Sequence, residues 1–177
     1  MVDALVSNTS DSNIVPVRSR PWALSSIRMS EKQNTHAEKQ LAIDKRYLKM
    51  ARIWATNSYC KRRQVGALIV KDKMIISDGY NGTPSGFENE CEDGNDMTKS
   101  YVLHAEANAI TKVAKSNNSS EGSTLYITTS PCMECSKLII QAGIIRVVYE
   151  EKYRITDGLE LLDRAKIDLV HIPDTGK

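Results

Sequence analysis

The sequence predicts an α/β domain of three layers (α/β/α), in which a five-stranded mixed sheet is flanked by helices. Three observations predict this class. The chain has 177 residues, 41% of them hydrophobic, which is enough for one domain with a core and short for two. Two β-rich runs follow each other closely over residues 65–77, as in a hairpin. From residue 124 onward, strand and helix patterns alternate regularly.

The N-terminal part differs in composition from the rest. Residues 1–40 are rich in serine, asparagine and charge, lack apolar periodicity and contain Pro16 and Pro21. We expect residues 1–40 to form a flexible extension and residues 41–177 to form the folded domain. Apolar residues recur at helical spacing over residues 47–55, behind an aspartate suited to capping, so we predict that the first helix begins at Asp44.

The remaining elements follow in order along the chain. Residues 65–70 and 74–77 form the hairpin, and residues 79–82 end its second strand. A polar loop over residues 83–100 is long enough to suggest a functional loop. We predict helices from His104 to about Lys115, over 132–141 and over 158–165, and strands over 124–128, 145–149 and 168–172.

Charge and hydropathy exclude several classes of function. The 24 lysines and arginines against 22 acidic residues give a net charge of +2, which lacks the basic surplus that binding a long phosphate backbone requires. No run approaches the roughly 20 apolar residues of a membrane span, and the N-terminus lacks the apolar region of a secretory signal. We therefore expect a cytoplasmic protein without membrane or nucleic-acid partners, whose four cysteines are reduced.

Two short motifs predict a metal site. His104-Ala105-Glu106 opens one predicted helix, and Pro131-Cys132-Met133-Glu134-Cys135 opens the next. Cysteines at positions i and i+3 of a first helical turn project from the same side, and the helix N-terminus favours their thiolates. With His104 they give zinc three protein ligands and leave a fourth tetrahedral position for water, as in catalytic sites.

Glu106 is the predicted proton shuttle. It lies two residues beyond His104, so its carboxylate can sit beside a zinc-bound water without being a ligand. It can take a proton from the water, deliver it to a ring nitrogen and later pass one to the departing amine. The two motifs together match the H-x-E…P-C-x-x-C signature of zinc-dependent nucleobase deaminases.

Other interpretations of the single motifs are weaker when the motifs are taken together. A lone C-x-x-C is typical of a zinc ribbon or of a dithiol redox site. A zinc ribbon requires a second such pair, which the sequence lacks, and a redox site does not explain the His104 motif. A zinc module in which the metal only stabilises the fold has no use for Glu106.

With these motifs, the sequence resembles the deoxycytidylate (dCMP) deaminases, a branch of the cytidine deaminase-like superfamily. The resemblance extends over about residues 44–172 and includes the segments QVGA at 64–67, DGYNG at 78–82 and AGI at 142–144. The zinc motifs specify the superfamily only, whereas the GYNG segment and the long loop before His104 favour the dCMP branch. The resemblance implies hydrolysis of dCMP to dUMP and ammonia, which supplies dUMP for thymidylate synthesis.

The resemblance also implies roles for residues outside the two motifs. Asn81 matches the asparagine that holds the sugar 3′-hydroxyl, although an Asn-Gly turn that only closes a strand is the alternative. Arg62, Tyr153 and Arg154 lie where similar enzymes bind the base and the 5′-phosphate, and Ala105 is placed with them as a substrate-binding residue. Exposed residues at strand ends often have no such role, so both interpretations stay open for these positions.

Regulation and assembly are implied in the same way. Many family members are hexamers that dCTP activates and dTTP inhibits, with the effector bound near the GYNG loop. The resemblance thus implies an effector site at Gly79, Tyr80, Asn81 and Gly82, and a homo-oligomer.

Part of the family holds a second, structural zinc. Cys60 and Cys91 lie near suitable positions, but position 102 is a valine, so we expect one zinc ion and two reduced cysteines.

Two related enzyme classes and one unrelated class are the alternatives. A tRNA adenosine deaminase uses the same zinc site, but polymer binding predicts a basic stripe that the mixed charges of the C-terminal half do not provide. Deaminases of pterin or riboflavin pathways usually carry a reductase domain, for which the chain has no room. The third alternative is the non-catalytic zinc module.

Overall fold

The computed structural model describes residues 21–174, with side chains described from Thr35 onward. The chain divides after Lys39 into two compact units, and the second unit, which begins at Gln40, contains the sheet. The predicted flexible extension lies partly outside the described residues, at positions 1–20. Within residues 21–174, no helix has both the length and the apolar character needed to cross a membrane.

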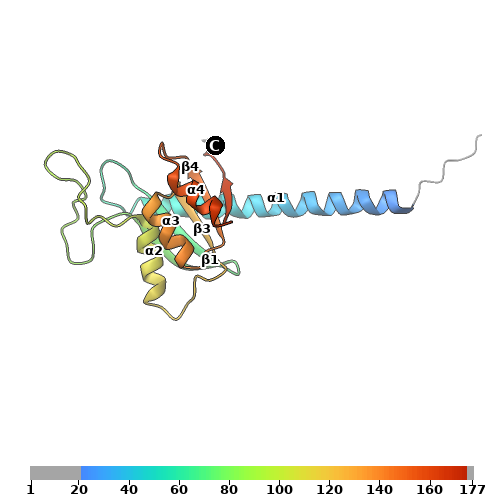
Figure 1. Cartoon of the computed structure of the whole chain (residues 1–177), viewed down its shortest axis with the longest axis horizontal. Coiled ribbons are helices and arrows are strands. Elements are labelled where there is room, and N and C mark those ends of the chain that lie inside the picture. Colours follow the sequence, from blue (N-terminus) through green and yellow to red (C-terminus); the bar gives the residue numbers. More distant parts are fainter. Residues whose placement is uncertain (1–20, 175–177) are drawn as a thin grey trace, which may run out of the picture. The chain divides into compact units, whose positions relative to one another are not determined.

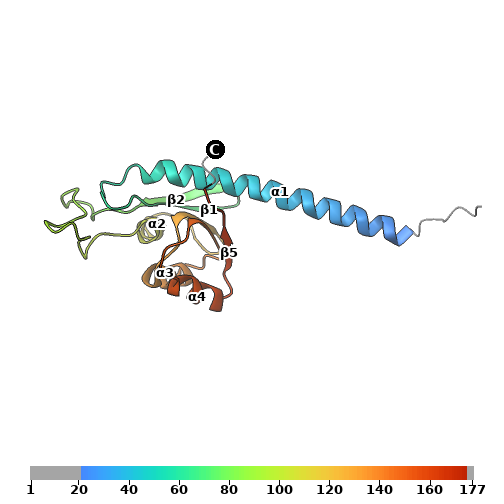
Figure 2. The same ribbon diagram turned by 90° about the horizontal axis from the view of Figure 1, so that it is seen from above.

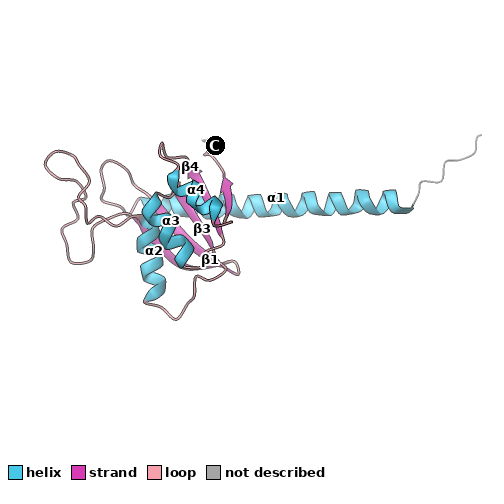
Figure 3. Cartoon of the chain, viewed as in Figure 1, coloured by secondary structure: helices cyan, strands magenta, loops and turns pink. Residues whose placement is uncertain are grey.

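A five-stranded mixed sheet forms the centre of the second unit (Figures 1 and 3), as the sequence predicted. The strands are β1 (Gly66–Lys71), β2 (Met74–Tyr80), β3 (Thr124–Thr129), β4 (Arg146–Glu151) and β5 (Asp168–His171), and their order in the sheet is β2-β1-β3-β4-β5. The first strand β1 pairs antiparallel with β2 and with β3. The crossover strands β3, β4 and β5 run parallel. The carboxyl ends of β3 and β4 therefore meet at one edge, where the loops to the next helices begin.

Helices cover both faces of the sheet, which confirms the predicted three layers. One core packs α2 (Ala105–Ala114), α3 (Met133–Gln141) and α4 (Asp157–Arg164) against one face through residues such as Ala109, Ile139 and Leu162. The other core packs Leu48 and Ala51, from the C-terminal part of α1, against the opposite face. Figure 2 shows this part of α1 on the side of the sheet away from α2, α3 and α4.

The first helix begins earlier than predicted. Helix α1 extends over Pro21–Ala55, so the prediction that it starts at Asp44 is wrong. Proline is tolerated in a first helical turn because its missing N–H has no partner there, and no further proline follows until Pro84. The residues between Pro21 and Asp44 include many good helix formers, which outweigh the lack of apolar periodicity.

Asp44 is buried in the core instead of capping a helix. It is 2% exposed. Its carboxylate accepts hydrogen bonds from both terminal nitrogens of Arg146, at 3.0 and 2.8 Å, and from the Tyr126 hydroxyl at 2.8 Å. Burial by itself would raise the pKa of Asp44, but these hydrogen bonds together outweigh it, and the pKa is lowered. The aspartate therefore joins α1 to β3 and β4.

Two of the cysteines predicted to be reduced form a disulfide. Cys60, in the segment between α1 and β1, is bonded to Cys91 of the long loop before α2, and their Cα atoms lie 5.0 Å apart. Both residues are buried. The expectation of four reduced cysteines is thus wrong for this pair, and both sulfurs are bonded to each other instead of being available to a second zinc ion. Cys132 and Cys135 are free thiols.

Candidate metal centre and pocket

The N-terminal ends of α2 and α3 bring the three predicted ligands together. His104 is the residue before α2 and Cys132 the residue before α3, each with an extended backbone, and Cys135 lies in the first turn of α3. The loop from β3 delivers Pro131 and Cys132 to the edge of the sheet where α2 also begins. Helix N-termini favour anionic ligands, so this is a suitable place for thiolates.

The three side chains have the spacing of a shared metal ion. Nδ1 of His104 lies 3.4 Å from Sγ of Cys132 and 3.4 Å from Sγ of Cys135. A tetrahedral zinc with the usual Zn–N and Zn–S lengths separates such ligand atoms by roughly 3.5 Å. Among residues 35–174, the three ligand atoms form one group within 4.8 Å and no fourth ligand joins it. The three side chains therefore fit a zinc ion that would keep one position open.

The pKa values of the three side chains are also shifted from their ordinary values. Hydrogen bonds that Cys132 receives from Cys135 and His104 lower the pKa of its thiol to about 3. The pKa of Cys135 is raised, chiefly because its thiol donates to Cys132 and because it is buried. The hydrogen bond with Cys132 raises the pKa of His104. These shifts favour the thiolate of Cys132, which is the form that binds zinc.

Glu106 lies next to these ligands and is buried. It occupies the first turn of α2 and is 4% exposed. Burial raises the pKa of its carboxyl group to about 7, in spite of the nearby His104. A carboxyl group with a pKa near the working pH can both accept and donate a proton, which is what a shuttle requires. Ala105, between the two functional residues, is fully buried and contributes to the pocket wall.

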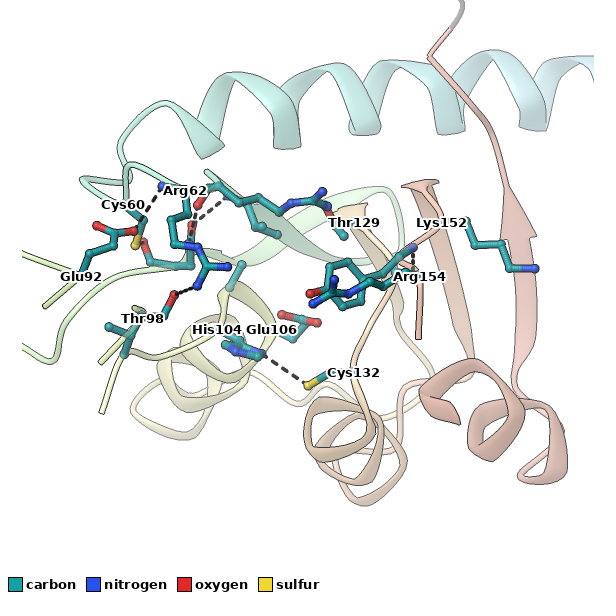
Figure 4. A pocket seen from close by; sticks show the side chains of 17 residues that line it. Cys60, Arg62, Glu92, Thr98, His104, Glu106, Thr129, Cys132, Lys152 and Arg154 are labelled. Carbon is teal, nitrogen blue, oxygen red and sulfur yellow. Dashed lines mark hydrogen bonds between the residues drawn. The ribbon is translucent and has the colours of Figure 1, made fainter. Parts of the chain in front are cut away.

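A pocket of about 530 Å³ is lined by two of the three ligands, His104 and Cys132 (Figure 4). This volume is in the range of small-molecule sites. All the predicted catalytic and substrate-binding residues line it, together with His104 and Cys132, whereas Cys135, Gly79, Tyr80 and Gly82 do not. The lining residues are Cys60, Arg62, Arg63, Val65, Asn81, Glu92, Thr98, Val102, His104, Ala105, Glu106, Thr129, Ser130, Cys132, Lys152, Tyr153 and Arg154.

Four cationic side chains line this pocket, namely Arg62, Arg63, Lys152 and Arg154. Arg63 and Lys152 were not predicted as site residues from the sequence. Arg63 forms a salt bridge with Glu151 at 3.0 Å, and its guanidinium lies 5.4 Å from the centre of the Tyr153 ring. The guanidinium of Arg154 lies 5.8 Å from the same ring. Figure 4 shows Lys152 directed away from the metal ligands. The only signal for Arg63 and Lys152 in the sequence is that each neighbours a predicted residue.

The side chain of Asn81 is held by the backbone before β1. Its Oδ1 accepts a hydrogen bond from the Val65 N–H at 2.8 Å, and its Nδ2 donates to the Arg63 carbonyl at 2.8 Å. The Asn-Gly pair does not make a simple hairpin turn here, because Gly82 pairs with Leu103 in a β-bridge. One lone pair and one amide hydrogen of Asn81 are left over for a ligand, since an amide side chain offers two of each.

The residues of the predicted effector site differ in their surroundings. Gly79 and Tyr80 belong to β2. A Cβ atom on Gly79 would lie 2.2 Å from the Ala105 carbonyl oxygen, so this glycine allows α2 to approach the sheet. The N–H of Gly82 donates to the Leu103 carbonyl at 3.0 Å, whereas a Cβ atom there would meet nothing closer than 3.9 Å.

The chain is similar to proteins of known activity. Residues 41–151 match the family model of the cytidine and deoxycytidylate deaminase zinc-binding region. The chain is 37% identical over 123 residues to the deoxycytidylate deaminase of Saccharomyces cerevisiae, with 64% of this chain and 39% of that enzyme covered. It is 36% identical over 130 residues to ComE operon protein 2 of Bacillus subtilis, covering 71% and 69%. The chain thus spans about two fifths of the length of the yeast enzyme.

A solved structure shows the same architecture. The dCMP deaminase of the cyanophage S-TIM5, in complex with dCMP and dUMP, superposes with a TM-score of 0.73 at 46% sequence identity. The superposition covers 74% of this chain and 97% of the cyanophage chain. The similarity therefore includes nearly the whole of that protein.

Proposed function

Because the chain belongs to the family of cytidine and deoxycytidylate deaminases with a zinc-binding region, we propose that it hydrolyses dCMP to dUMP and ammonia. One observation carries the proposal: a buried carboxyl group, Glu106, lies beside three convergent side chains that fit a zinc ion, and it lines a pocket together with four cations. The similarity to a cyanophage dCMP deaminase that binds dCMP and dUMP supports this substrate. The dUMP product would supply thymidylate synthesis.

His104, Cys132 and Cys135 would hold one catalytic zinc ion. When bound, zinc supplies an electrophilic centre that lowers the pKa of water to about 7. Glu106 takes one proton from the attacking water and transfers it to N3 of the ring as the oxygen adds to C4. Glu106 then moves the second proton of that water to the amino group. The C4–N4 bond breaks, ammonia leaves, and a C4 carbonyl forms.

The other lining residues would bind the nucleotide. Arg62 and Arg154 make no ion pair among residues 35–174, so their charges are available to a phosphate. Asn81 has hydrogen-bonding capacity left for the sugar 3′-hydroxyl. Tyr153 is held by its N–H, which donates to the Ser130 hydroxyl at 2.9 Å, and its ring can face the base. Ala105 forms the wall next to the reacting ring.

Regulation by dCTP and dTTP, a hexameric assembly and a cytoplasmic location belong to the same proposal by family resemblance. Effector binding at residues 79–82 would make dCMP titrations sigmoidal, and added dCTP would make them hyperbolic. Curves that are hyperbolic and indifferent to dCTP would contradict regulation. Light scattering of the purified chain would measure the assembly.

The proposed activity is tested by the loss of cytosine absorbance with a panel of substrates. The purified chain is offered dCMP, deoxycytidine, dCTP and a tRNA separately, with and without a zinc chelator. We expect turnover of dCMP that the chelator abolishes and added zinc restores. Activity confined to the tRNA would show a polymer deaminase instead, and no turnover with a fully loaded site would show a zinc ion that only stabilises the fold.

A further inference from the structure

We propose that Glu92 and the Cys60–Cys91 disulfide position Arg62 at the pocket and thereby set the affinity for the anionic end of the substrate. We call the group Cys91, Glu92 and Thr98, with the disulfide, the loop clamp. The inference rests on the proposed function, since it assumes that Arg62 faces the substrate phosphate. It assigns a positioning role to the loop that leads into α2.

The loop before α2 folds back on itself to build the clamp. Glu92 and Thr98 form an isolated antiparallel bridge, and the Lys99 N–H donates to the Cys91 carbonyl at 2.8 Å. The Asp93 carboxylate closes the turn between them by accepting the N–H groups of Asn95 and Met97 at 2.9 and 3.0 Å. The clamp is therefore a defined hairpin-like unit within an otherwise irregular segment.

Glu92 holds the backbone of Arg62. Its Oε1 accepts the N–H of Lys61 at 3.1 Å and that of Arg62 at 3.2 Å, and its Oε2 lies 3.2 Å from the Lys61 nitrogen. The carboxylate is 9% exposed, and among residues 35–174 it makes no ion pair. A buried carboxylate is stable only when hydrogen bonds replace its water, so the 61–62 backbone is its main partner.

This arrangement leaves the Arg62 guanidinium available. The nearby Glu92 carboxylate accepts hydrogen bonds from backbone N–H groups and not from the guanidinium. The guanidinium makes a long contact, of 3.4 Å, with the Thr98 hydroxyl. In contrast, the neighbouring Arg63 is paired with Glu151. Figure 4 shows Glu92, Cys60 and Thr98 around Arg62 on one side of the pocket. The clamp thus fixes the base of the Arg62 side chain without neutralising its charge.

The segment that carries Arg62 has no helix or strand of its own. Residues 56–65 connect α1 to β1, and Asn81 anchors the carbonyl of Arg63 and the hydroxyl of Ser58. Between these anchors, the disulfide and Glu92 tie positions 60–62 to the loop before α2, and the Cys60 N–H also donates to the Ser58 hydroxyl at 3.2 Å. Loss of the clamp would let Arg62 sample many positions, and binding would then require ordering it again.

The experiment compares Glu92→Ala with Glu90→Ala, which removes an exposed carboxylate two residues away in the same loop. We expect Glu92→Ala to raise the KM for dCMP about tenfold, while kcat and the zinc content stay within about twofold of the wild type. Deoxycytidine lacks the phosphate, so its KM should hardly change. Glu92→Gln keeps one acceptor oxygen and should give an intermediate KM, and Cys91→Ser should shift the KM in the same direction as Glu92→Ala.

Several outcomes would overturn the inference. Equal losses with dCMP and deoxycytidine, or a lower kcat at unchanged KM, would show a general structural role for Glu92. An unchanged KM for dCMP in both Glu92→Gln and Cys91→Ser would also overturn the inference. These two variants decide the question if Glu92→Ala does not fold. A wild-type chain without turnover would contradict the proposed function alone. In that case weaker dUMP binding by Glu92→Gln, measured by calorimetry, would still support the clamp, and equal binding would refute it.

Discussion

Glu106 joins two properties that are rarely found in one side chain. It is almost fully buried, and it lies beside Cys132, whose thiol has a lowered pKa. Burial therefore raises the pKa of its carboxyl group to about 7. A strongly shifted acidic group in a pocket is a sign of function, because a purely structural position would favour an amide or an apolar side chain.

We predict that Glu106→Gln abolishes turnover and leaves the metal site intact. The amide keeps the size of the side chain but cannot transfer protons, so kcat should fall by about 10³-fold or more. The matched control is Glu134→Gln, which changes an exposed carboxylate next to Cys135 that is paired with Lys137. Steady-state kinetics and zinc analysis of both variants measure the effect. Similar activity in the two variants would refute the proton shuttle.

The same carboxyl group predicts how the metal-free chain responds to pH. The folded pKa lies near 7 and the ordinary value is 4.5, so the ionised form is disfavoured in the folded state. A carboxyl group with a raised folded pKa destabilises the fold as pH rises above its unfolded pKa, and the penalty levels off above the folded pKa. Between pH 5 and 8, with a zinc chelator present, the free energy of unfolding of the wild type should fall by up to about 3 kcal/mol relative to that of Glu106→Gln. Urea unfolding at several pH values measures this difference, and parallel pH curves would contradict it.

At the scale of elements, the close approach of α2 to β2 positions two functional residues together. Gly79 of β2 lies directly beneath the first turns of α2, where a Cβ atom would be 2.2 Å from the Ala105 carbonyl and 2.7 Å from the Ala109 nitrogen. His104 and Glu106 flank Ala105, so any shift of this helix end moves a ligand and the shuttle. The glycine expected to bind an effector is therefore also a packing residue.

We predict that Gly79→Ala destabilises the fold by about 3 kcal/mol and strongly reduces activity, because backbone atoms of α2 cannot yield as a side chain would. Gly82→Ala is the matched control, since its added Cβ atom would have its nearest neighbour at 3.9 Å. Its stability should change by less than about 1 kcal/mol. Thermal unfolding and kcat of both variants measure this contrast. Equal stability of the two would show that α2 can move freely on the sheet.

Patterns that are local in the sequence were predicted well. The strands, helices α2–α4 and the grouping of His104 with Cys132 and Cys135 depend on runs or motifs within a few residues, and the similarity to dCMP deaminases, which the motifs indicated, is confirmed. Features that depend on distant partners were missed. Asp44 was expected to cap a helix because its partner Arg146 lies 102 positions away. The Cys60–Cys91 bond likewise spans 31 positions, across a loop whose path no local pattern describes.

At the scale of the whole second unit, the two faces of the sheet have different tasks. One face carries α2 and α3, whose N-terminal ends hold the metal ligands. The opposite face is covered by the C-terminal part of α1, which β3 and β4 contact through Tyr126 and Arg146. Stability and catalysis should therefore be separable by substitutions on the α1 face.

We predict that Asp44→Asn destabilises the fold by about 3 kcal/mol, because it leaves the charge of Arg146 half-buried without its main partner. Asp168→Asn removes the second carboxylate from the same arginine, but that carboxylate is 63% exposed, so the free energy of unfolding should fall by less than about 1 kcal/mol.

The difference between the two variants should depend on pH. The pKa of Asp44 is lowered in the fold, so the stability that Asp44 contributes is present above its ordinary pKa and is lost as pH falls through the folded value. The gap between the two variants should accordingly close below about pH 4. Urea unfolding across pH measures it, and kcat of both variants at neutral pH should stay within about twofold of the wild type because the metal ligands lie on the other face. Equal destabilisation by the two variants would show that Arg146 does not distinguish its buried partner from its exposed one.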